Sequence, residues 1–368
     1  MPLRILSWLT ESRWRAKPPR PQPYHPAPAA ASVTQTAAIS VPVAELPAPS
    51  ASAGNAATAE EFRSHLDTEI ADALQHLEAA LSPEELAGDP GALLQNLCGD
   101  ITGAIRRPPI AAQQALSACR DPNASLGQIL EAFHQDPALT QALLKHANSP
   151  FYTTGEPLAS LDAAAQRVGL SGLHGVLMGS MVEGLLCRPG GEYGTMVQQV
   201  WTHMVRTAPA ARRIGRATGA NPEKCYTLGL LHDLGKLIVF DRLTAMRTSG
   251  RQTLRIPRTF LRDVLGRLHG PIGGVAALQW NLDVESARAI AAHPRETYRR
   301  YQDSWYGDIG FTLEESEGET LSQVLAVAEW WDLTTTVRRE KPDYDTFWAR
   351  TGLSISIDDC RQALDESR

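Results

Sequence analysis

An all-α protein is predicted by three features of the sequence. Apolar residues recur every three or four positions over most of the chain after residue 60, which is the spacing of one helix face. Residues that cap helices, such as Ser82 and Ser125, stand immediately before several of these stretches. No segment has the convincing apolar–polar alternation of a β-strand. We therefore expect a bundle of helices, preceded by a segment without regular structure.

The first 59 residues differ in composition from the rest. Ten of the 25 prolines fall within the first 50 residues, and the segment 17–59 consists mainly of Pro, Ala, Ser, Thr and Val. Such a segment cannot bury enough apolar surface to offset the entropy lost on ordering, so we expect residues 1–59 to form a disordered tail and linker. Residues 3–17 mix apolar and basic side chains. They fit either a short amphipathic helix that weakly contacts a partner or an anionic membrane surface, or a frayed tail.

Helical patterns follow one another closely after the linker. Residues 60–104 are expected to form a helical lead-in, in which Leu66, Ile70 and Leu74 share one face. A Pro-Gly-Gly turn at residues 189–191 interrupts the later patterns. The expected helices are residues 60–80, 126–134, 136–148, 161–169, 170–186, 196–217, 222–240, 257–268, 271–281, 284–293 and 320–336.

Composition limits the classes of function. The 368 residues include 35 Lys and Arg against 41 Asp and Glu, a net charge of −6, which argues against a dedicated nucleic-acid-binding protein. No uncharged apolar run approaches the roughly 18 residues of a membrane-spanning helix. Five scattered cysteines without a CxxC spacing indicate neither a zinc ribbon nor a disulfide framework, so a reducing cytoplasm is the expected location. The motifs of P-loop, serine-hydrolase and dinucleotide-binding enzymes are missing from the sequence.

The adjacent residues His232 and Asp233 are the first candidates for chemistry. Neighbouring side chains on a helix project about 100° apart, so both could reach one metal ion in a crevice between helices. Imidazole plus carboxylate, without thiolate, suits Fe, Mn, Zn or Mg, and such an ion would acidify a bound water and orient a phosphate. Lys236 follows one turn later, where its ammonium could hold a phosphate oxygen.

Other candidate ligands lie on or beside the neighbouring predicted helices. Every histidine after residue 174 has such a position, and a carboxylate lies on a late helix. The candidates are His203, His232, His269, His293 and Glu329. A single histidine on a helix is more often a structural polar residue, and Glu329 and Asp332 could equally face solvent, so this ligand set is a hypothesis. Pro294 follows His293 directly and predicts that the helix ends there.

Several motifs occur in a fixed order between residues 105 and 300. They are Pro108-Pro-Ile, Asp136-Pro-Ala-Leu-Thr, Lys145-His-Ala-Asn-Ser-Pro-Phe-Tyr152, Ser160–Leu170, Leu228–Leu237 and His269–Trp280. Together they resemble an HDOD domain, the signalling relative of the HD phosphohydrolases. Residues 1–59 and 60–104 precede this domain, and residues 301–368 would form a C-terminal helical extension that completes its HD-like half.

The resemblance implies a helical bundle in two sublobes and a role in bacterial signal transduction. It also invites comparison with the similar HD-GYP cyclic di-GMP phosphodiesterases, whose metal ligands run His, His-Asp, His, His-His, Asp. In that order the ligands here would be His203, His232, Asp233, His269 and His293, with Glu329 in place of the final aspartate. Pro294 stands where the second histidine of the pair would be, and the GYP segment is absent.

Two functions are compatible with these features. The first is a regulatory HDOD protein that binds a signalling partner or a nucleotide-type ligand, with a partly retained divalent-metal site or no metal. The second is a metal-dependent phosphohydrolase that acts on a nucleotide or a cyclic dinucleotide, with Asp233 and Lys236 as catalytic residues. The missing histidine and GYP segment favour the first.

Overall fold

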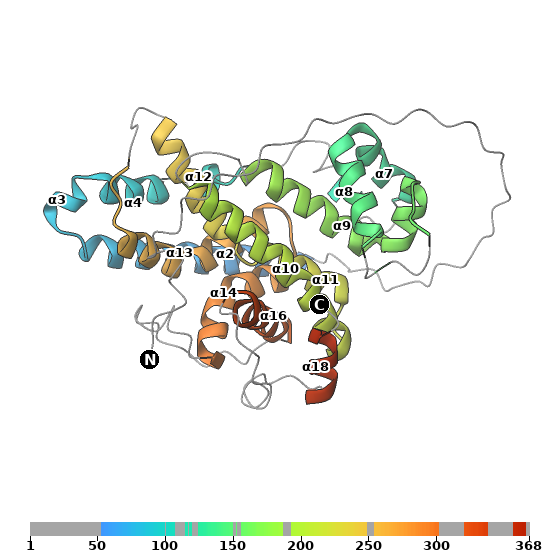
Figure 1. The fold of residues 1–368 in the computed structure, drawn as a ribbon. Coiled ribbons are helices and arrows are strands. Elements are labelled where there is room, and N and C mark those ends of the chain that lie inside the picture. The colour runs from blue at the N-terminus through green and yellow to red at the C-terminus, as the bar shows by residue number, and fades with distance from the viewer. Residues whose placement is uncertain are drawn as a thin grey trace, which may run out of the picture. The chain divides into compact units, whose positions relative to one another are not determined.

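Helices make up all the regular structure in the described part of the chain (Figure 1), which confirms the predicted all-α class. The computed structural model describes residues 53–99, 101–106, 115–116, 118–119, 124–149, 152, 156–186, 193–248, 254–301, 320–337 and 356–365. The expected tail and the amphipathic segment 3–17 lie outside these residues, except that 53–59 belong to the first described helix. Among the described helices, none is long and apolar enough to cross a membrane.

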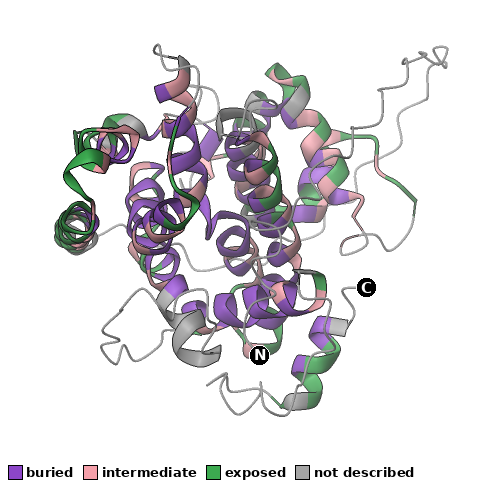
Figure 2. Ribbon diagram, turned by 60° about the vertical axis from the view of Figure 1, so that its left-hand side comes forward, coloured by how far each residue is buried: buried purple, intermediate pink, exposed green. Residues whose placement is uncertain are grey.

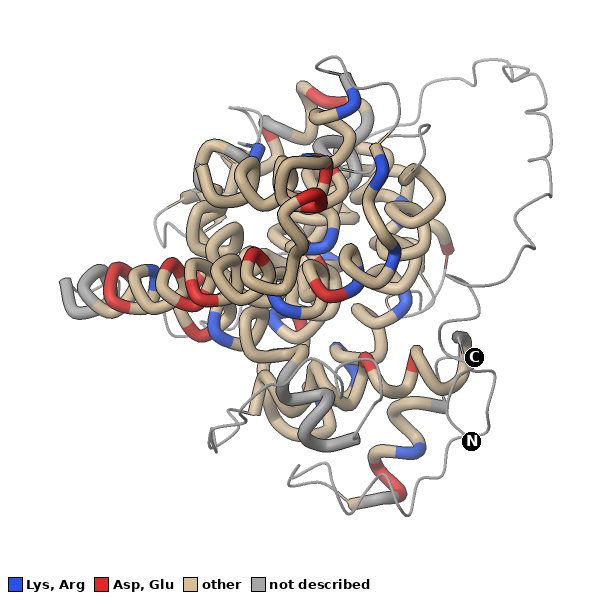
Figure 3. Tube along the Cα trace, turned by 90° about the vertical axis from the view of Figure 1, so that its left-hand side faces the viewer, with Lys and Arg blue, Asp and Glu red and all other residues tan. Residues whose placement is uncertain are grey.

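The lead-in region forms α2 (Ala53–Ala79), α3 (Pro83–Leu86) and α4 (Asp89–Gly99), followed by the short α5 (Ile101–Ala104). α2 begins ahead of the expected residue 60 and packs on α13 and α14. It carries six acidic residues and one arginine (Figure 3), so the face turned away from α13 is polar. Ser82 caps α3 as predicted, in a reciprocal capping box with Glu85.

The first lobe consists of α7 (Leu126–Gln135), α8 (Pro137–Ala147) and the start of α9 (Leu161–Leu186). Ser125 caps α7 as predicted and exchanges hydrogen bonds with Gln128. α9 spans both helices expected there, and its one non-helical residue, Gly169, lies at the expected junction. Beyond Gly169 the helix packs on α11, so α9 links the first lobe to the second.

The second lobe holds the candidate histidines. Its helices are α10 (Gly194–Thr218), α11 (Pro222–Leu231), α12 (Leu234–Thr248), α13 (Arg258–Gln279), α14 (Val284–Tyr301) and α16 (Thr320–Asp332), which the π-helical turn η1 (Leu333–Val337) extends. α18 (Ile357–Asp365) packs on α10. The buried residues line the faces where helices meet (Figure 2), and α10 lies against both α11 and α16.

Three of the predicted helix boundaries are wrong. The stretch 222–240 is two helices, because the chain turns at His232–Asp233. The stretches 257–268 and 271–281 form the single helix α13, which runs through Pro271, and α14 runs through Pro294 instead of ending at His293. A proline removes one backbone donor from a helix, but tertiary contacts can hold the helix together on both sides. Here α13 and α14 pack against each other.

Candidate metal centre

The six residues expected to bind a metal lie together in the second lobe. They form three overlapping triads, and within each triad one ligand atom per residue lies within 4.8 Å of the others. The triads are His203–His232–Asp233, His232–His293–Glu329 and Asp233–His269–His293. All six are buried: the exposed fraction is 0% for His232, His269 and His293, 1% for Asp233, 2% for Glu329 and 8% for His203.

Two close helix contacts bring these residues together. A Cβ atom at Gly229 would lie 2.7 Å from the Cα of Ala208, so only glycine allows α11 to approach α10 this closely. A Cβ atom at Gly235 would lie 1.9 Å from the carbonyl oxygen of His269, so glycine is equally needed where α12 meets α13. As a result, the His232–Asp233 turn between α11 and α12 lies beside both neighbouring helices.

Three of the histidines point Nδ1 at a backbone carbonyl. A carbonyl oxygen can only accept a hydrogen bond, so Nδ1 carries the hydrogen, and in the neutral ring Nε2 keeps its lone pair. Burial lowers the pKa of both His232 and His269 well below its ordinary value, which keeps these two rings neutral. The Nδ1–O distances are 2.9 Å from His232 to Gly229, 2.5 Å from His269 to Leu265 and 2.6 Å from His293 to Ile290.

Two of these carbonyls are free to accept for reasons visible in the chain. Gly229 lies in the last turn of α11, where carbonyls have no helical partner. The carbonyl of Ile290 would normally accept from the amide of residue 294, but Pro294 has no N–H to donate. The proline that was expected to end the helix therefore leaves an acceptor that orients His293.

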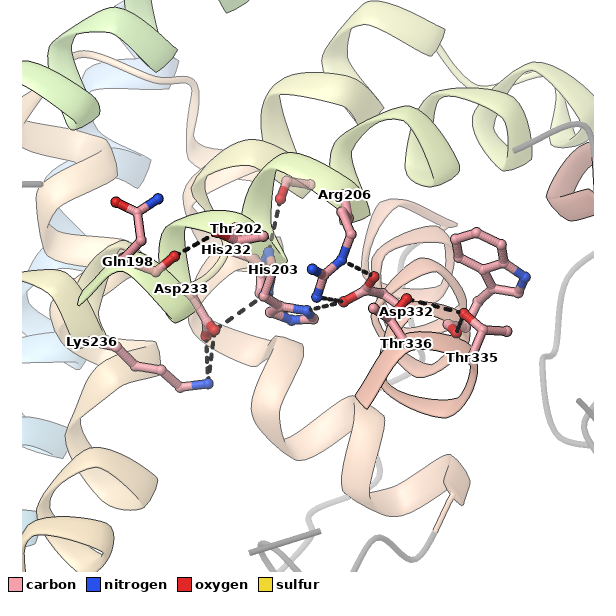
Figure 4. A network of polar contacts seen from close by, with 12 residues as sticks. Gln198, Thr202, His203, Arg206, His232, Asp233, Lys236, Asp332, Thr335 and Thr336 are labelled. Carbon is pink, nitrogen blue, oxygen red and sulfur yellow. Dashed lines mark hydrogen bonds and ion pairs between the residues drawn. The ribbon is translucent and has the colours of Figure 1, made fainter. Parts of the chain in front are cut away.

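His203 is held in a different way, by a carboxylate from another helix. Its Nδ1 lies 2.6 Å from Oδ2 of Asp332, and Arg206 donates two hydrogen bonds of 2.7 and 3.1 Å to the same carboxylate (Figure 4). Burial would raise the pKa of Asp332, but the hydrogen bonds from His203 and Arg206 outweigh it and lower the pKa to about 2. Sequence reasoning missed both partners, although each lies three residues after a candidate ligand and hence on the same helix face.

The Nε2 atoms of the four histidines meet in two pairs. The separation is 3.1 Å between His203 and His232 and 3.3 Å between His269 and His293. Two lone pairs this close repel each other unless a proton or a metal ion lies between them. Two nitrogens bound to one ion at about 2.0–2.1 Å are roughly 3.0–3.4 Å apart, so both separations fit ligands that share an ion.

Asp233 lies between the two histidine pairs. Its Oδ1 is 3.6 Å from Nε2 of His269 and 3.4 Å from that of His293, and its Oδ2 is 3.6 Å from that of His232. The ammonium of Lys236 is 2.8 Å from both oxygens, but it has hydrogen-bond geometry only toward Oδ2, so Oδ1 is buried without a hydrogen bond. Burial would raise the pKa of Asp233, yet the Lys236 charge holds it well below its usual range.

These residues therefore fit a divalent metal ion. The facing lone pairs require positive charge between them, and Oδ1 of Asp233, which accepts no hydrogen bond, offers an anionic oxygen beside them. Each ring also donates its other nitrogen to a carbonyl or a carboxylate, which is the usual support for a metal-binding histidine.

Comparisons with known proteins relate the chain to one domain family. A sequence profile of the HDOD domain matches residues 105–296. The chain is 29% identical over 182 residues to an uncharacterised protein of Treponema pallidum, a match that covers 48% of this chain. The matched region spans about a third of that relative, 35% of its length.

Two solved structures share the fold at low sequence identity. A protein of Shewanella amazonensis, described as a candidate metal-dependent phosphohydrolase, is 19% identical with a TM-score of 0.55, over 76% of this chain and 99% of its own. An HDOD domain protein of unknown function from Geobacter sulfurreducens is 21% identical with a TM-score of 0.51, over 72% and 89%. Since the HDOD profile covers more than half of the 368 residues and the helices form the two expected lobes, this chain belongs to the HDOD family.

Proposed function

We propose that this protein is a signal-transduction HDOD protein that acts mainly as a regulatory binding module and holds a divalent metal ion in its second lobe. The observation that carries the proposal is the burial of a whole donor set, since His232, His269 and His293 are 0% exposed. Structural metal sites are closed by protein ligands, whereas catalytic sites keep one position open. A closed set favours an ion that stabilises the lobe over one that turns over a substrate.

The chemistry of the donors narrows the choice of metal. Four imidazoles suit Fe and Zn, and the carboxylates of Asp233 and Glu329 also permit Mn. Mg is disfavoured because it prefers oxygen ligands and retains its waters. A bound ion would supply the positive charge that the facing Nε2 atoms lack, and Oδ1 of Asp233 would be a further ligand beside them.

A regulatory role needs a partner outside the cluster. We propose a signalling protein or a nucleotide-type ligand, and the net charge of −6 argues against nucleic acid. A reducing cytoplasm is the proposed setting, supported by the free thiols of Cys98, Cys225 and Cys360.

A second candidate is a metal-dependent phosphohydrolase acting on a nucleotide or a cyclic dinucleotide. It is favoured by Lys236, whose side chain is 12% exposed at the edge of the cluster and contacts Asp233. His203, at 8%, is the most exposed of the candidate ligands and belongs to the same triad as Asp233. A phosphate that reached this edge would meet the Lys236 ammonium, and a bound ion would supply Lewis-acid chemistry beside it.

Metal analysis combined with an activity screen separates the two. Purified wild type is compared with the double variant His232→Ala/Asp233→Ala by elemental analysis and by phosphodiesterase assays on cyclic dinucleotides and mononucleotides. The control, Glu61→Ala/His65→Ala, removes the same kinds of side chain from the exposed face of α2.

Each result has a clear meaning. Stoichiometric Fe, Mn or Zn in wild type and control, lost in the cluster variant and without turnover, supports the regulatory module. Turnover that disappears with the metal supports the phosphohydrolase. A wild type that contains no metal and takes up none on titration contradicts both.

A further inference from the structure

The four histidines of the cluster depend on different parts of the molecule for their orientation. His232, His269 and His293 donate to carbonyls three or four residues earlier in the chain, so local helix geometry fixes them. His203 on α10 instead donates to Asp332 on α16, 129 residues later (Figure 4). The direction of its Nε2 is therefore a tertiary property, set by the packing of α16 on α10.

Arg206 makes this contact between α10 and α16 rigid. It lies one turn after His203 and binds both oxygens of Asp332, with Nε 2.7 Å from Oδ1 and Nη2 3.1 Å from Oδ2. Such a two-point guanidinium contact fixes the plane of a carboxylate as well as its position. Asp332 is fully buried and contacts both His203 and Arg206 of α10, so its carboxylate has little freedom to turn away from His203.

α16 also carries Glu329, which belongs to the triad with His232 and His293 and is 2% exposed. The helix begins at Thr320, beyond the residues 105–296 that match the HDOD profile. One helix outside the matched region thus contributes both a candidate ligand and the carboxylate that orients another.

We infer that Asp332, locked by Arg206, is the positioning residue of His203, and that docking of α16 on α10 and metal binding at the cluster are coupled. This inference rests on the proposed metal site. Without Asp332 the His203 ring can rotate or exchange its hydrogen between nitrogens, and Nε2 then loses its fixed direction. Coupling is reciprocal, so a bound ion also strengthens the docking of α16.

The test compares two Arg–Asp pairs of similar geometry, in each of which the carboxylate is buried and the arginine is about a third exposed. Asp332→Ala and Asp332→Asn alter the pair at the cluster. Asp241→Ala and Asp241→Asn alter the control pair, in which Arg106 binds Asp241 at 3.0 and 2.9 Å and the carboxylate is 5% exposed. All variants are made in the full chain, and affinity for Zn²⁺ and Mn²⁺ is measured by competition with a chelator.

We expect Asp332→Ala to weaken metal binding by about tenfold to a hundredfold, the usual effect of losing a ligand's supporting partner. Asp332→Asn keeps an acceptor oxygen for Nδ1 and should weaken binding less. Both Asp241 variants should bind metal within about twofold of wild type. Affinities unchanged in both Asp332 variants, or reduced equally in the Asp241 variants, would overturn the inference.

Two further measurements separate this inference from the proposed function. In metal-free protein labelled with ¹⁵N-histidine, NMR should show His203 with its hydrogen on Nδ1 in wild type and on Nε2 to a large extent in Asp332→Ala. An unchanged tautomer would overturn the positioning role even if no metal binds. Hydrogen exchange over residues 320–337 should slow on metal addition, and unchanged exchange in a protein that does bind metal would overturn the coupling.

Discussion

Two clusters of buried polar side chains lie at the two ends of α11, and they differ in how their buried charges are balanced. At its start, Arg212 of α10 is 1% exposed, pairs with Glu223 and Tyr152, and lies over the rings of Tyr152 and Tyr226, 4.5 and 4.7 Å from their centroids. At its end, the Nε2 atoms of the four histidines face one another in two pairs without a donor between them, beside the Lys236–Asp233 ion pair.

The two clusters differ in whether each cation faces a counterion and each acceptor a donor. The Arg212 cluster contains its own cation and counterion, and it joins the segment after α8 to α10 and α11, so its role is to hold the lobes together. The histidine cluster has an excess of acceptors, which is costly in a buried site unless a cation is added. Buried charges that are balanced by a counterion indicate a structural role, whereas buried acceptors that face one another indicate a site for a cation.

The largest effect on stability is expected in the Arg212 cluster. Glu223→Gln removes the counterion but leaves Arg212 buried, and breaking a buried pair in this way costs about 3–5 kcal/mol in the free energy of unfolding. Urea denaturation measures this loss, which should be the same with and without a chelator. In the control, Glu285→Gln, the pair with Lys224 is exposed and the cost should stay below about 1 kcal/mol. Equal costs in the two variants would contradict the anchoring role of Arg212.

The histidine cluster should respond to metal instead. If an ion binds, wild type gains about 2.7 kcal/mol of stability when free metal is a hundredfold above the dissociation constant, and chelator removes that gain. His232→Ala should lack this metal-dependent gain in stability. Glu223→Gln should retain it, because the substituted residue lies at the other end of α11. Melting curves of wild type that coincide with and without chelator would show that metal adds no stability.

A smaller effect is expected at acid pH, where protonation of His146 beside Arg212 should lower the stability of the fold. Burial, followed by the Arg212 charge, lowers the pKa of His146 to about 4. Between pH 4 and 6.5 the unfolded state then binds more protons than the folded state, so stability rises with pH in this window and is lost as pH falls. His146 contributes at most about 1.4 kcal/mol per pH unit to this slope, or about 1.6 kcal/mol between pH 6.5 and 5. The buried His232 and His269, whose pKa values are also lowered, add to the slope in the same direction.

Denaturation with chelator between pH 5 and 7.5 checks this slope. His146→Gln should reduce the slope by the contribution of one histidine, while His134→Gln, which changes an exposed histidine of α7, should leave it unchanged. The neighbouring tyrosines do not titrate in the window, because burial raises the pKa of Tyr226 to about 12 and that of Tyr152 further. A slope that stays the same in His146→Gln would assign the acid sensitivity to other groups.

Much of the fold could be predicted from the sequence, because helix faces and caps are local signals. The apolar spacing of Leu66, Ile70 and Leu74 and the caps at Ser82 and Ser125 all appear in the structure. The turn at His232 was not predictable in this way. It depends on the contact of Gly235 with the backbone of α13, which local periodicity does not encode.

The candidate site was predictable to a similar extent. The resemblance to HD-type proteins selected six residues that the structure brings together, although metal binding by them stays a prediction. The role of Asp332 was not predicted, because nothing in the local sequence distinguishes a buried carboxylate from an exposed one on the same helix. The effect of Pro294 was predicted wrongly, because the helix continues through it. The local effect of a proline is known, since it removes one backbone donor, but the result depends on which group then donates to the freed carbonyl.

Pro294→Ala tests that consequence, and the change in metal affinity that it should cause is the smallest effect of the series. Alanine restores the N–H that can donate to Ile290 and is intrinsically better in a helix than proline, so the metal-free protein should become more stable, by at most about 3 kcal/mol. The same N–H competes with Nδ1 of His293 for that carbonyl, so metal affinity should fall about tenfold.

Pro271→Ala in α13 is the control, because no cluster histidine donates to the carbonyl that Pro271 leaves free. It should change stability without changing metal affinity. Denaturation with chelator and metal competition measure the two quantities, and a Pro294→Ala protein that binds metal as tightly as wild type would show that the freed carbonyl does not position His293.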